Sequence, residues 1–237
     1  MNTEEVLAIL GKVGAGITGS HVVYTSDLHG TDYVDKDALY PHTGETSRLC
    51  REIAGRFADD NVEVVIAPAI GGVVLSQWVA HHLTLITGRE VLAFYAEKET
   101  IRLFDSSKGR NFPHLGESHH RETGEFIIKR GGAKNVIPGK RVLVVEDVLT
   151  TGGTVKKVVE ATRALGGNAI GVGALCNRGG ITAADIGLDS GRLDALVNIS
   201  LDSWTEDECA CTGPCFHGVP INEEVGKGRE FMARRRP

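Results

Sequence analysis

The chain contains 237 residues, with 26 Lys and Arg against 31 Asp and Glu, so its net charge is −5. This acidic balance argues against a general nucleic-acid or membrane-surface binder, because both kinds of partner are anionic. Hydrophobic residues make up 41% of the chain, and no apolar run reaches the roughly 20 residues that span a bilayer. The five cysteines are odd in number and unevenly placed, which favours a reduced protein in the cytoplasm.

Helical spacing predicts a first helix directly after the N-terminus. Asn2 or Thr3 can cap this helix, and the glycines that follow residue 13 would end it. Its apolar face is expected to contain Val6, Leu7, Leu10 and Val13. A polar, turn-rich stretch follows, and we expect residues 1–45 to form one N-terminal unit.

Alternating strands and helices are predicted from residue 46 to residue 205. The apolar spacing is helical over residues 43–60, 73–87 and 155–165. Apolar, β-branched runs predict strands at residues 62–67, 90–96, 126–128, 141–145, 169–175 and 195–201. Because most of these strands are apolar throughout and helices separate them, the pattern predicts an α/β fold with a parallel sheet covered on both faces. Residues 206–237 would form a cysteine-containing tail.

The segment from about residue 97 to residue 124 is long, polar and weakly periodic, which predicts a functional, mobile loop. Residues 98–141 contain ten Lys and Arg against five Asp and Glu. One interpretation of such a run is a solvated face without a binding role. Its position after a predicted strand favours a role in binding, because α/β sheets bind ligands at the carboxyl ends of their strands.

The most informative motif joins the strand predicted at residues 141–145 to the helix predicted at residues 155–165. Two adjacent carboxylates precede a threonine- and glycine-rich loop: Glu146, Asp147, Val148, Leu149, Thr150, Thr151, Gly152, Gly153 and Thr154. Glycines let a phosphate approach the backbone, and the N–H groups of a helix N-terminus bind anions. The carboxylates can accept hydrogen bonds from sugar hydroxyls. The alternative is a plain strand-to-helix turn, in which two buried acids side by side would be costly. The motif therefore predicts a phosphorylated sugar as ligand.

This segment resembles the motif with which type I phosphoribosyltransferases bind 5-phosphoribosyl 1-diphosphate (PRPP). Other segments are similar to the orotate phosphoribosyltransferase branch of that family, in the same order along the chain: Tyr24–Asp27, Tyr33–Lys36, Pro68–Gly72, Lys98–Glu99 and Cys176–Arg178. The resemblance implies a five-stranded parallel sheet flanked by helices, with a small hood from the N-terminal segment. It also implies transfer of a phosphoribosyl group from PRPP to a nucleobase with release of pyrophosphate.

The resemblance assigns roles around the sugar and the leaving group. Glu146 and Asp147 would hold the ribose hydroxyls, and the loop after them would hold the 5′-phosphate. The backbone of Ala69, Ile70, Gly71 and Gly72 would bind pyrophosphate. The expected catalytic residues are Lys98 and Arg102, whose positive charge would stabilise the departing pyrophosphate, and Asp147, which would bind ribose hydroxyls beside Mg²⁺. For Lys98 and for the glycine loop, the alternatives are a solvated lysine and an ordinary turn.

Thr150 and Arg178 are the residues expected to bind the base. A guanidinium can form paired hydrogen bonds with a planar acidic edge, although Arg178 could also pair with Asp185 on the surface. The cofactor implied is Mg²⁺ bound through PRPP, and the assembly implied is a homodimer.

Two questions stay open at the level of sequence. Orotate is the favoured acceptor, but a purine acceptor and a PRPP-sensing regulator without catalysis are the alternatives. In the tail, Cys209, Cys211 and Cys215, together with His217, could hold zinc or could form a reduced turn.

Overall fold

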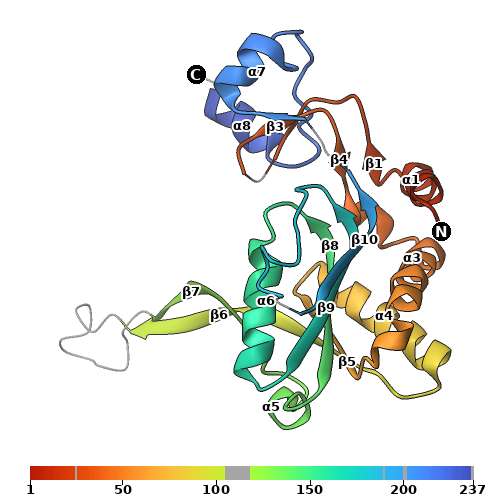
Figure 1. The fold of residues 1–237 in the computed structure, drawn as a ribbon. Helices are drawn as coiled ribbons and strands as arrows, with labels where there is room; N and C mark the ends of the chain where they lie inside the picture. The colour runs from red at the N-terminus through yellow and green to blue at the C-terminus, as the bar shows by residue number, and fades with distance from the viewer. Residues whose placement is uncertain (25, 105–117, 189, 200–201, 236–237) are drawn as a thin grey trace, which may run out of the picture.

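A six-stranded sheet organises the structure, which is a computed structural model (Figure 1). The structure describes every residue except 25, 105–117, 189, 200–201 and 236–237. The strands of this sheet are β5 (Val64–Pro68), β6 (Leu92–Phe104), β7 (Ser118–Ile127), β8 (Arg141–Leu149), β9 (Asn168–Asn177) and β10 (Arg192–Asn198). Their order is β10-β9-β8-β5-β6-β7, and all neighbours are parallel except β6 and β7. The five predicted parallel strands are confirmed.

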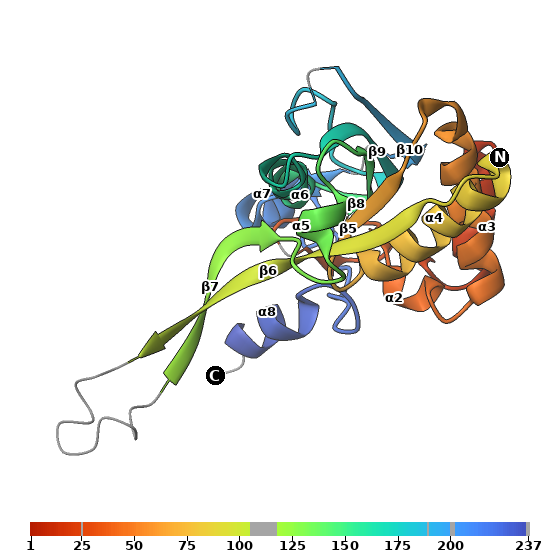
Figure 2. The same cartoon turned by 90° about the horizontal axis from the view of Figure 1, so that it is seen from below.

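The sixth strand corrects the prediction for residues 97–124. β6 continues to Phe104 and pairs antiparallel with β7, so much of the expected loop is a two-stranded ribbon. The strand predicted at residues 126–128 belongs to the end of β7. Figures 1 and 2 show this ribbon projecting from the body of the molecule. A ribbon without a core on either face has no need of alternating apolar residues, so its sequence carries little strand signal. The rest of the expected loop, residues 105–117, lies outside the described residues.

Helices cover both faces of the sheet (Figure 1). One face carries α1 (Thr3–Lys12), α3 (Thr43–Arg56) and α4 (Gly72–Thr87), and the other carries α5 (Ala133–Val136) and α6 (Gly153–Ala164). A short 3₁₀ turn, η1 (Ala58–Asp60), follows α3. Alternate residues of β5 enter the two cores: Val65 and Ala67 belong to the cluster with α3 and α4, and Val64 and Ile66 to the cluster with α6. This explains why the strand is apolar throughout.

The first helix forms as predicted, but the prediction of its buried face is wrong at one residue. Asn2 caps α1 and forms a reciprocal capping box with Glu5. Val6, Ile9 and Leu10 are buried. Leu7, expected on this face, is 43% exposed. The buried stripe is displaced toward Ile9, because the helix packs along one narrow side.

The N-terminal segment and the tail together form the hood. Its strands are β2 (Val22–Val23), β3 (His29–Gly30) and β11 (Ser203–Trp204), in the order β11-β3-β2. The remaining elements are β1 (Gly16–Ile17) paired with β4 (Tyr33–Val34), α2 (Lys36–Leu39), α7 (Glu206–Thr212) and α8 (Gly228–Arg235). Backbone hydrogen bonds join the two chain ends: Asn222 N–H donates to the His21 carbonyl, and Lys227 N–H to the Val23 carbonyl. The tail is therefore part of the hood and no separate appendage.

None of the helices in the described part of the chain is long and apolar enough to cross a membrane.

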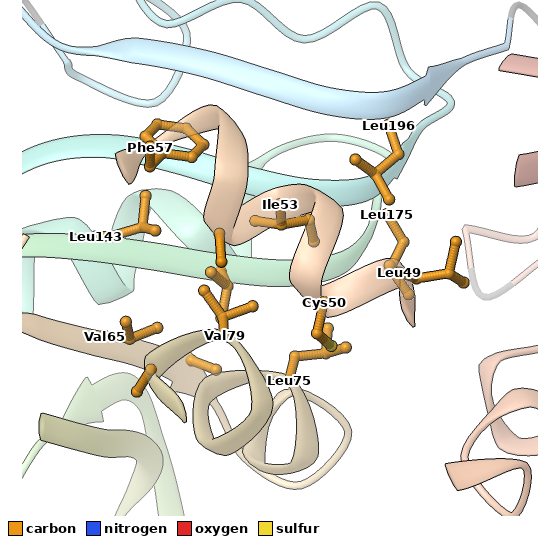
Figure 3. Close-up of a cluster of buried hydrophobic side chains, with 14 of the residues drawn as sticks. Leu49, Cys50, Ile53, Phe57, Val65, Leu75, Val79, Leu143, Leu175 and Leu196 are labelled. Atoms are coloured by element: carbon orange, nitrogen blue, oxygen red, sulfur yellow. The ribbon is translucent and has the colours of Figure 1, made fainter. Parts of the chain in front are cut away.

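Close packing of α3 against β9 fixes one side of the core (Figure 3). Ile53 of α3 and Phe57 directly after it lie over Gly173, where an added Cβ would come within 2.7 Å of the Ile53 Cγ2 and 3.3 Å of the Phe57 Cε2. Glycine at this position therefore lets the helix approach the sheet, and any side chain would push the two apart.

We expect Gly173→Ala to lower the free energy of unfolding by about 1–3 kcal/mol, because it overpacks this contact. Gly55→Ala, on the exposed side of the same helix with no atom within 4 Å of the added Cβ, is the matched control. It should stabilise the protein by roughly 0.5–1 kcal/mol. Both values can be measured by urea denaturation. Equal stability of Gly173→Ala and the wild type would contradict the packing described.

Candidate functional site

An open cavity of about 540 Å³ lies at the carboxyl ends of β5 and β8. Its lining contains Ser26, Lys36, Lys98, Phe126, residues 68–72 and residues 146–155. The structure thus brings together the three segments that the sequence singled out: the loop after β8, the glycine loop after β5 and Lys98 at the base of the ribbon. Parallel strands cause this convergence, because they end at one edge of the sheet.

Two helices begin at this cavity without side-chain caps. Gly71 precedes α4 and Gly152 precedes α6, and neither of these residues caps its helix with a side chain; at α6 the Gly153 N–H makes a long contact of 3.5 Å with the Thr151 Oγ1. Gly152 has φ of 72°, a left-handed conformation that glycine adopts without strain. The first backbone N–H groups of a helix have no partner within the helix, and together with the helix dipole they attract anions. The cavity therefore offers two separate anion sites, one at each helix start.

The glycine loop lies directly over a half-buried ion pair. A Cβ on Gly71 would come within 2.5 Å of the Lys36 Nζ and 2.8 Å of the Asp147 Oδ2. A side chain here would displace that pair, so the position requires glycine. A cis peptide bond joins Ala69 and Ile70 in the same loop. The predicted loop from Ala69 to Gly72 thus lies at the cavity through its backbone, as the sequence implied.

Glu146 and Asp147 are nearly buried at the end of β8, with 7% and 6% of their surface exposed. The Glu146 Oε1 accepts a hydrogen bond from the Asp147 N–H at 3.1 Å, and the Asp147 Oδ1 accepts one from the Val148 N–H at 2.6 Å. Burial, followed by the charge of neighbouring Asp147, raises the pKa of Glu146 well above its usual range. Two acids in this environment need a cation or hydroxyl donors to be stable in the ionised form.

Lys36 supplies part of that charge, and the sequence assigned it no role. Its Nζ lies 3.0 Å from the Asp147 Oδ2, and the Tyr40 hydroxyl donates to the same oxygen at 3.3 Å. Burial opposes the Lys36 charge, but the Asp147 carboxylate outweighs this effect and raises the pKa of Lys36. A local sequence feature could have pointed to Lys36. Asp35 is a residue that often caps helices, and its side chain accepts a hydrogen bond from the Asp37 N–H, so that Lys36 is the first residue of α2.

The two cationic residues predicted to be catalytic, Lys98 and Arg102, lie at different positions along the ribbon. Lys98 lines the cavity, and its Nζ lies 2.9 Å from the Glu122 Oε2 of β7, with both side chains more than half exposed. Arg102 is four residues farther along β6, roughly 13 Å toward the tip, and is not among the lining residues. Lys98 therefore lines this cavity, whereas Arg102 does not.

A smaller cavity adjoins the first and shares Lys36, Asp147, Val148 and Thr150 with it. Arg178 lies in this second cavity, where its Nη2 donates to the Thr150 Oγ1 at 3.2 Å. Its guanidinium also lies 4.0 Å from the centre of the Tyr24 ring. The alternative pairing of Arg178 with Asp185 does not form, since Asp185 accepts hydrogen bonds from Thr182. Thr150 and Arg178, predicted to act together, are thus in direct contact.

The tail cysteines do not form the group considered from their spacing. Cys211 and His217 are exposed, while Cys209 is buried and Cys215 half-buried. Cys209 and Cys215 lie instead beside two histidines of the N-terminal segment. A helix explains the separation, since residues two apart in α7 point to different sides.

Comparison with known proteins places the chain in a family. The family described as "Phosphoribosyl transferase domain" matches residues 35–191. The chain belongs to the phosphoribosyltransferase family. An orotate phosphoribosyltransferase of Pelotomaculum thermopropionicum is 36% identical over 220 residues, which cover 93% of this chain and 95% of that protein. The same enzyme of Thermus thermophilus is 34% identical over 219 residues, covering 92% and 99%.

Solved structures agree on the fold of the family. The orotate phosphoribosyltransferase of Mycobacterium tuberculosis matches with a TM-score of 0.57 at 21% identity, covering 83% of this chain and 95% of that one. The adenine phosphoribosyltransferase of Thermoanaerobacter pseudethanolicus matches with a TM-score of 0.53 at 16% identity, covering 81% and 99%. Because members with different bases share the fold, the fold by itself does not identify the acceptor.

The buried acid pair yields a prediction about stability and pH. Since the pKa of Glu146 is raised in the folded protein, the folded state binds a proton that the unfolded state has released above about pH 4.5. The wild type should therefore lose stability as the pH rises from this value toward the raised pKa. Glu146→Gln should escape that loss and be more stable at neutral pH by roughly 1–3 kcal/mol.

Thermal unfolding followed over this pH range measures the difference. Glu160→Gln, the same substitution at an exposed position of α6, is the control and should change stability by less than about 0.5 kcal/mol at every pH. If the difference in stability between Glu146→Gln and the wild type does not grow with pH, the surroundings of Glu146 do not disfavour its ionised form.

Proposed function

We propose that the chain transfers the 5-phosphoribosyl group of PRPP to orotate, giving orotidine 5′-phosphate and pyrophosphate. The observation that carries this proposal is the pair Glu146–Asp147, which lies between two uncapped helix starts and next to the cavity of Arg178. Curated relatives more than 30% identical over nearly the whole chain are described as orotate phosphoribosyltransferases. The M. tuberculosis enzyme of the same fold is described in complex with PRPP.

Each part of PRPP has a matching group in the cavity. The N-terminus of α6, with the hydroxyls of Thr151 and Thr154, suits the 5′-phosphate. Glu146 and Asp147 suit the ribose 2′- and 3′-hydroxyls, which would donate hydrogen bonds to the carboxylates. The N-terminus of α4 and the backbone of the Gly71 loop suit the diphosphate. In the reaction, the bond from the anomeric carbon to the diphosphate oxygen breaks. A ring nitrogen of the base then bonds to that carbon and loses its proton.

Charge on the leaving pyrophosphate needs cations beside it. Lys98 is placed to supply one from the ribbon, and Lys36 a second from the hood. Asp147 and Glu146 offer the carboxylate oxygens that Mg²⁺ prefers, so these residues fit a magnesium ion bound together with PRPP. Such an ion would neutralise charge on the diphosphate and would orient it.

A homodimer in the cytoplasm belongs to the same proposal. The ribbon of β6 and β7 projects beyond the body of the subunit (Figure 2), and exposed Arg102 lies along it, out of reach of its own cavity. In a dimer, this ribbon could reach the cavity of the second subunit. All five cysteines are free, in agreement with a reducing location.

Pyrophosphate release in the presence of PRPP, Mg²⁺ and a panel of bases tests the proposal directly. We expect release with orotate and none with adenine, hypoxanthine or guanine. Release with a purine but not with orotate would make the purine the acceptor. The proposal of phosphoribosyl transfer from PRPP would then still hold. Binding of PRPP without release for any base would favour a regulator that senses PRPP.

Lys98 provides a test of catalysis. If it stabilises charge that grows on pyrophosphate, Lys98→Ala should lower kcat by roughly one to two decades and change the KM for PRPP less. Lys129→Ala is the matched control, because Lys129 is equally exposed and pairs with Glu97 but does not line the cavity. Initial rates at varied PRPP separate the two constants. A change in KM alone would make Lys98 a binding residue with no special role in the transition state.

Arg178 provides a test of base recognition. A lysine cannot reproduce the paired hydrogen bonds of a guanidinium, so Arg178→Lys should raise the KM for orotate by roughly one to two decades. The KM for PRPP should stay nearly unchanged. Arg192→Lys, which alters an arginine stacked on Phe57 away from the cavities, is the control. An unchanged KM for orotate in Arg178→Lys would place the base against another residue.

A further inference from the structure

Four metal-binding side chains meet in the hood, far along the chain from one another. His21 precedes β2, His29 lies in β3, Cys209 lies in α7, and Cys215 follows that helix. One ligand atom from each lies within 4.8 Å of the other three. His21, His29 and Cys209 are buried, and Cys215 is half-buried. None of these residues lines the cavities assigned to PRPP and the base.

The distances between the ligand atoms suit a small tetrahedral ion. The His21 Nε2 lies 2.7 Å from the His29 Nδ1, and the sulfur atoms of Cys209 and Cys215 each lie 3.7 Å from the His21 Nε2. The Cys215 sulfur is also 3.7 Å from the His29 Nδ1. Zinc bonds of about 2.0–2.1 Å to nitrogen and about 2.3 Å to sulfur place tetrahedral ligands roughly 3.3–3.8 Å apart. These four separations differ from that range by less than about 1 Å, and the remaining two are no longer than 4.8 Å.

The groups around the cluster orient its ligands. The His21 Nδ1 lies 2.8 Å from the Val219 carbonyl oxygen, so its N–H donates there and the Nε2 lone pair faces the cluster. The Cys215 N–H donates to the Cys209 sulfur at 3.2 Å, which holds the two cysteines side by side. The ring of Phe231 in α8 packs edge-on against His29, at 5.0 Å between ring centres, and screens the histidine from water. Metal-binding histidines usually have a second nitrogen fixed by a hydrogen bond, as His21 has, whereas the His29 Nε2 is buried without a partner.

We propose that His21, His29, Cys209 and Cys215 bind one Zn²⁺ in a closed structural site. Two nitrogen and two thiolate ligands in tetrahedral positions are the set that zinc takes in structural sites, whereas magnesium and calcium take oxygen. Binding releases the protons of the two thiols. Four protein ligands leave no open position, so the ion would have no part in chemistry on a substrate.

The site has a mechanical purpose in the hood. Its sheet consists of strands of two residues each, too little to hold together by burial alone. The ion would fasten the tail to the N-terminal segment across a separation of 188 residues between His21 and Cys209. The same segment carries Tyr24, which lies over Arg178. A fixed hood therefore holds that aromatic ring in place at the smaller cavity.

Metal analysis of the untagged full chain, purified without chelator, tests the site. We expect about one zinc per chain in the wild type and less than about 0.1 in Cys209→Ser and Cys215→Ser. Cys211→Ser is the matched control, since this exposed cysteine lies two residues from Cys209 in the same helix, and it should keep the full zinc content. Equal zinc in Cys209→Ser and the wild type would overturn the proposal.

Cobalt binding to the wild type is a second measurement, which does not depend on whether the cysteine variants fold. Wild-type chain refolded with Co²⁺ in place of zinc should show the intense visible bands of a tetrahedral site and a near-ultraviolet thiolate-to-cobalt band. A zinc-free wild type without these bands would also overturn the proposal. Removal of zinc by a strong chelator should lower the Tm of the wild type and leave that of Cys209→Ser unchanged. These readouts need no substrate, so a failure of the orotate proposal would not be mistaken for a failure of this one.

Discussion

The buried pair of carboxylates at the end of β8 is the constraint around which the functional part of the structure is built. Glu146 and Asp147 sit where solvent cannot stabilise their charge, so the surrounding elements have to supply positive charge and hydrogen-bond donors. The Lys36 ammonium and the Tyr40 hydroxyl both contact Asp147, and the first turns of α4 and α6 point toward the same cavity. A ligand rich in hydroxyls and phosphates would complete this arrangement.

The same constraint ties the hood to the core. Lys36 begins α2, outside the central sheet, yet its charge is needed by an acid at the end of a central strand. The Gly71 loop then has to lie over this ion pair without a side chain. Three segments distant in sequence therefore depend on one contact, and a change in any of them alters the charge that the acid pair experiences.

The hood also determines the second cavity. Arg178 comes from the end of β9, Thr150 from the loop after β8, and Tyr24 from the hood. Contact of the guanidinium with the threonine hydroxyl and the tyrosine ring holds it in one orientation, which is the condition for recognising a planar acidic edge. Because the hood has so little apolar core of its own, its position depends on the links between the two chain ends, which include the cluster of His21, His29, Cys209 and Cys215.

The sequence by itself determined the parallel α/β core and the acidic and glycine-rich motif that follows one of its strands. These features follow from local patterns: buried parallel strands are apolar throughout, helices repeat at their own period, and parallel strands end at a common edge. The five parallel strands and the convergence of residues 69–72, Lys98 and residues 146–154 could be predicted for this reason.

Only the tertiary structure decided which distant side chains meet. The ribbon of β6 and β7 projects beyond the core, so its residues carry little periodic signal, and Arg102 on this ribbon does not line the cavity that Lys98 lines. Lys36 and Asp147 are neighbours through packing of the hood, and Cys209 and Cys215 join His21 and His29, with Cys211 and His217 left at the surface. Spacing along a chain reports neighbours within one helix or strand. Contacts between elements depend on how those elements pack, which the local pattern does not encode.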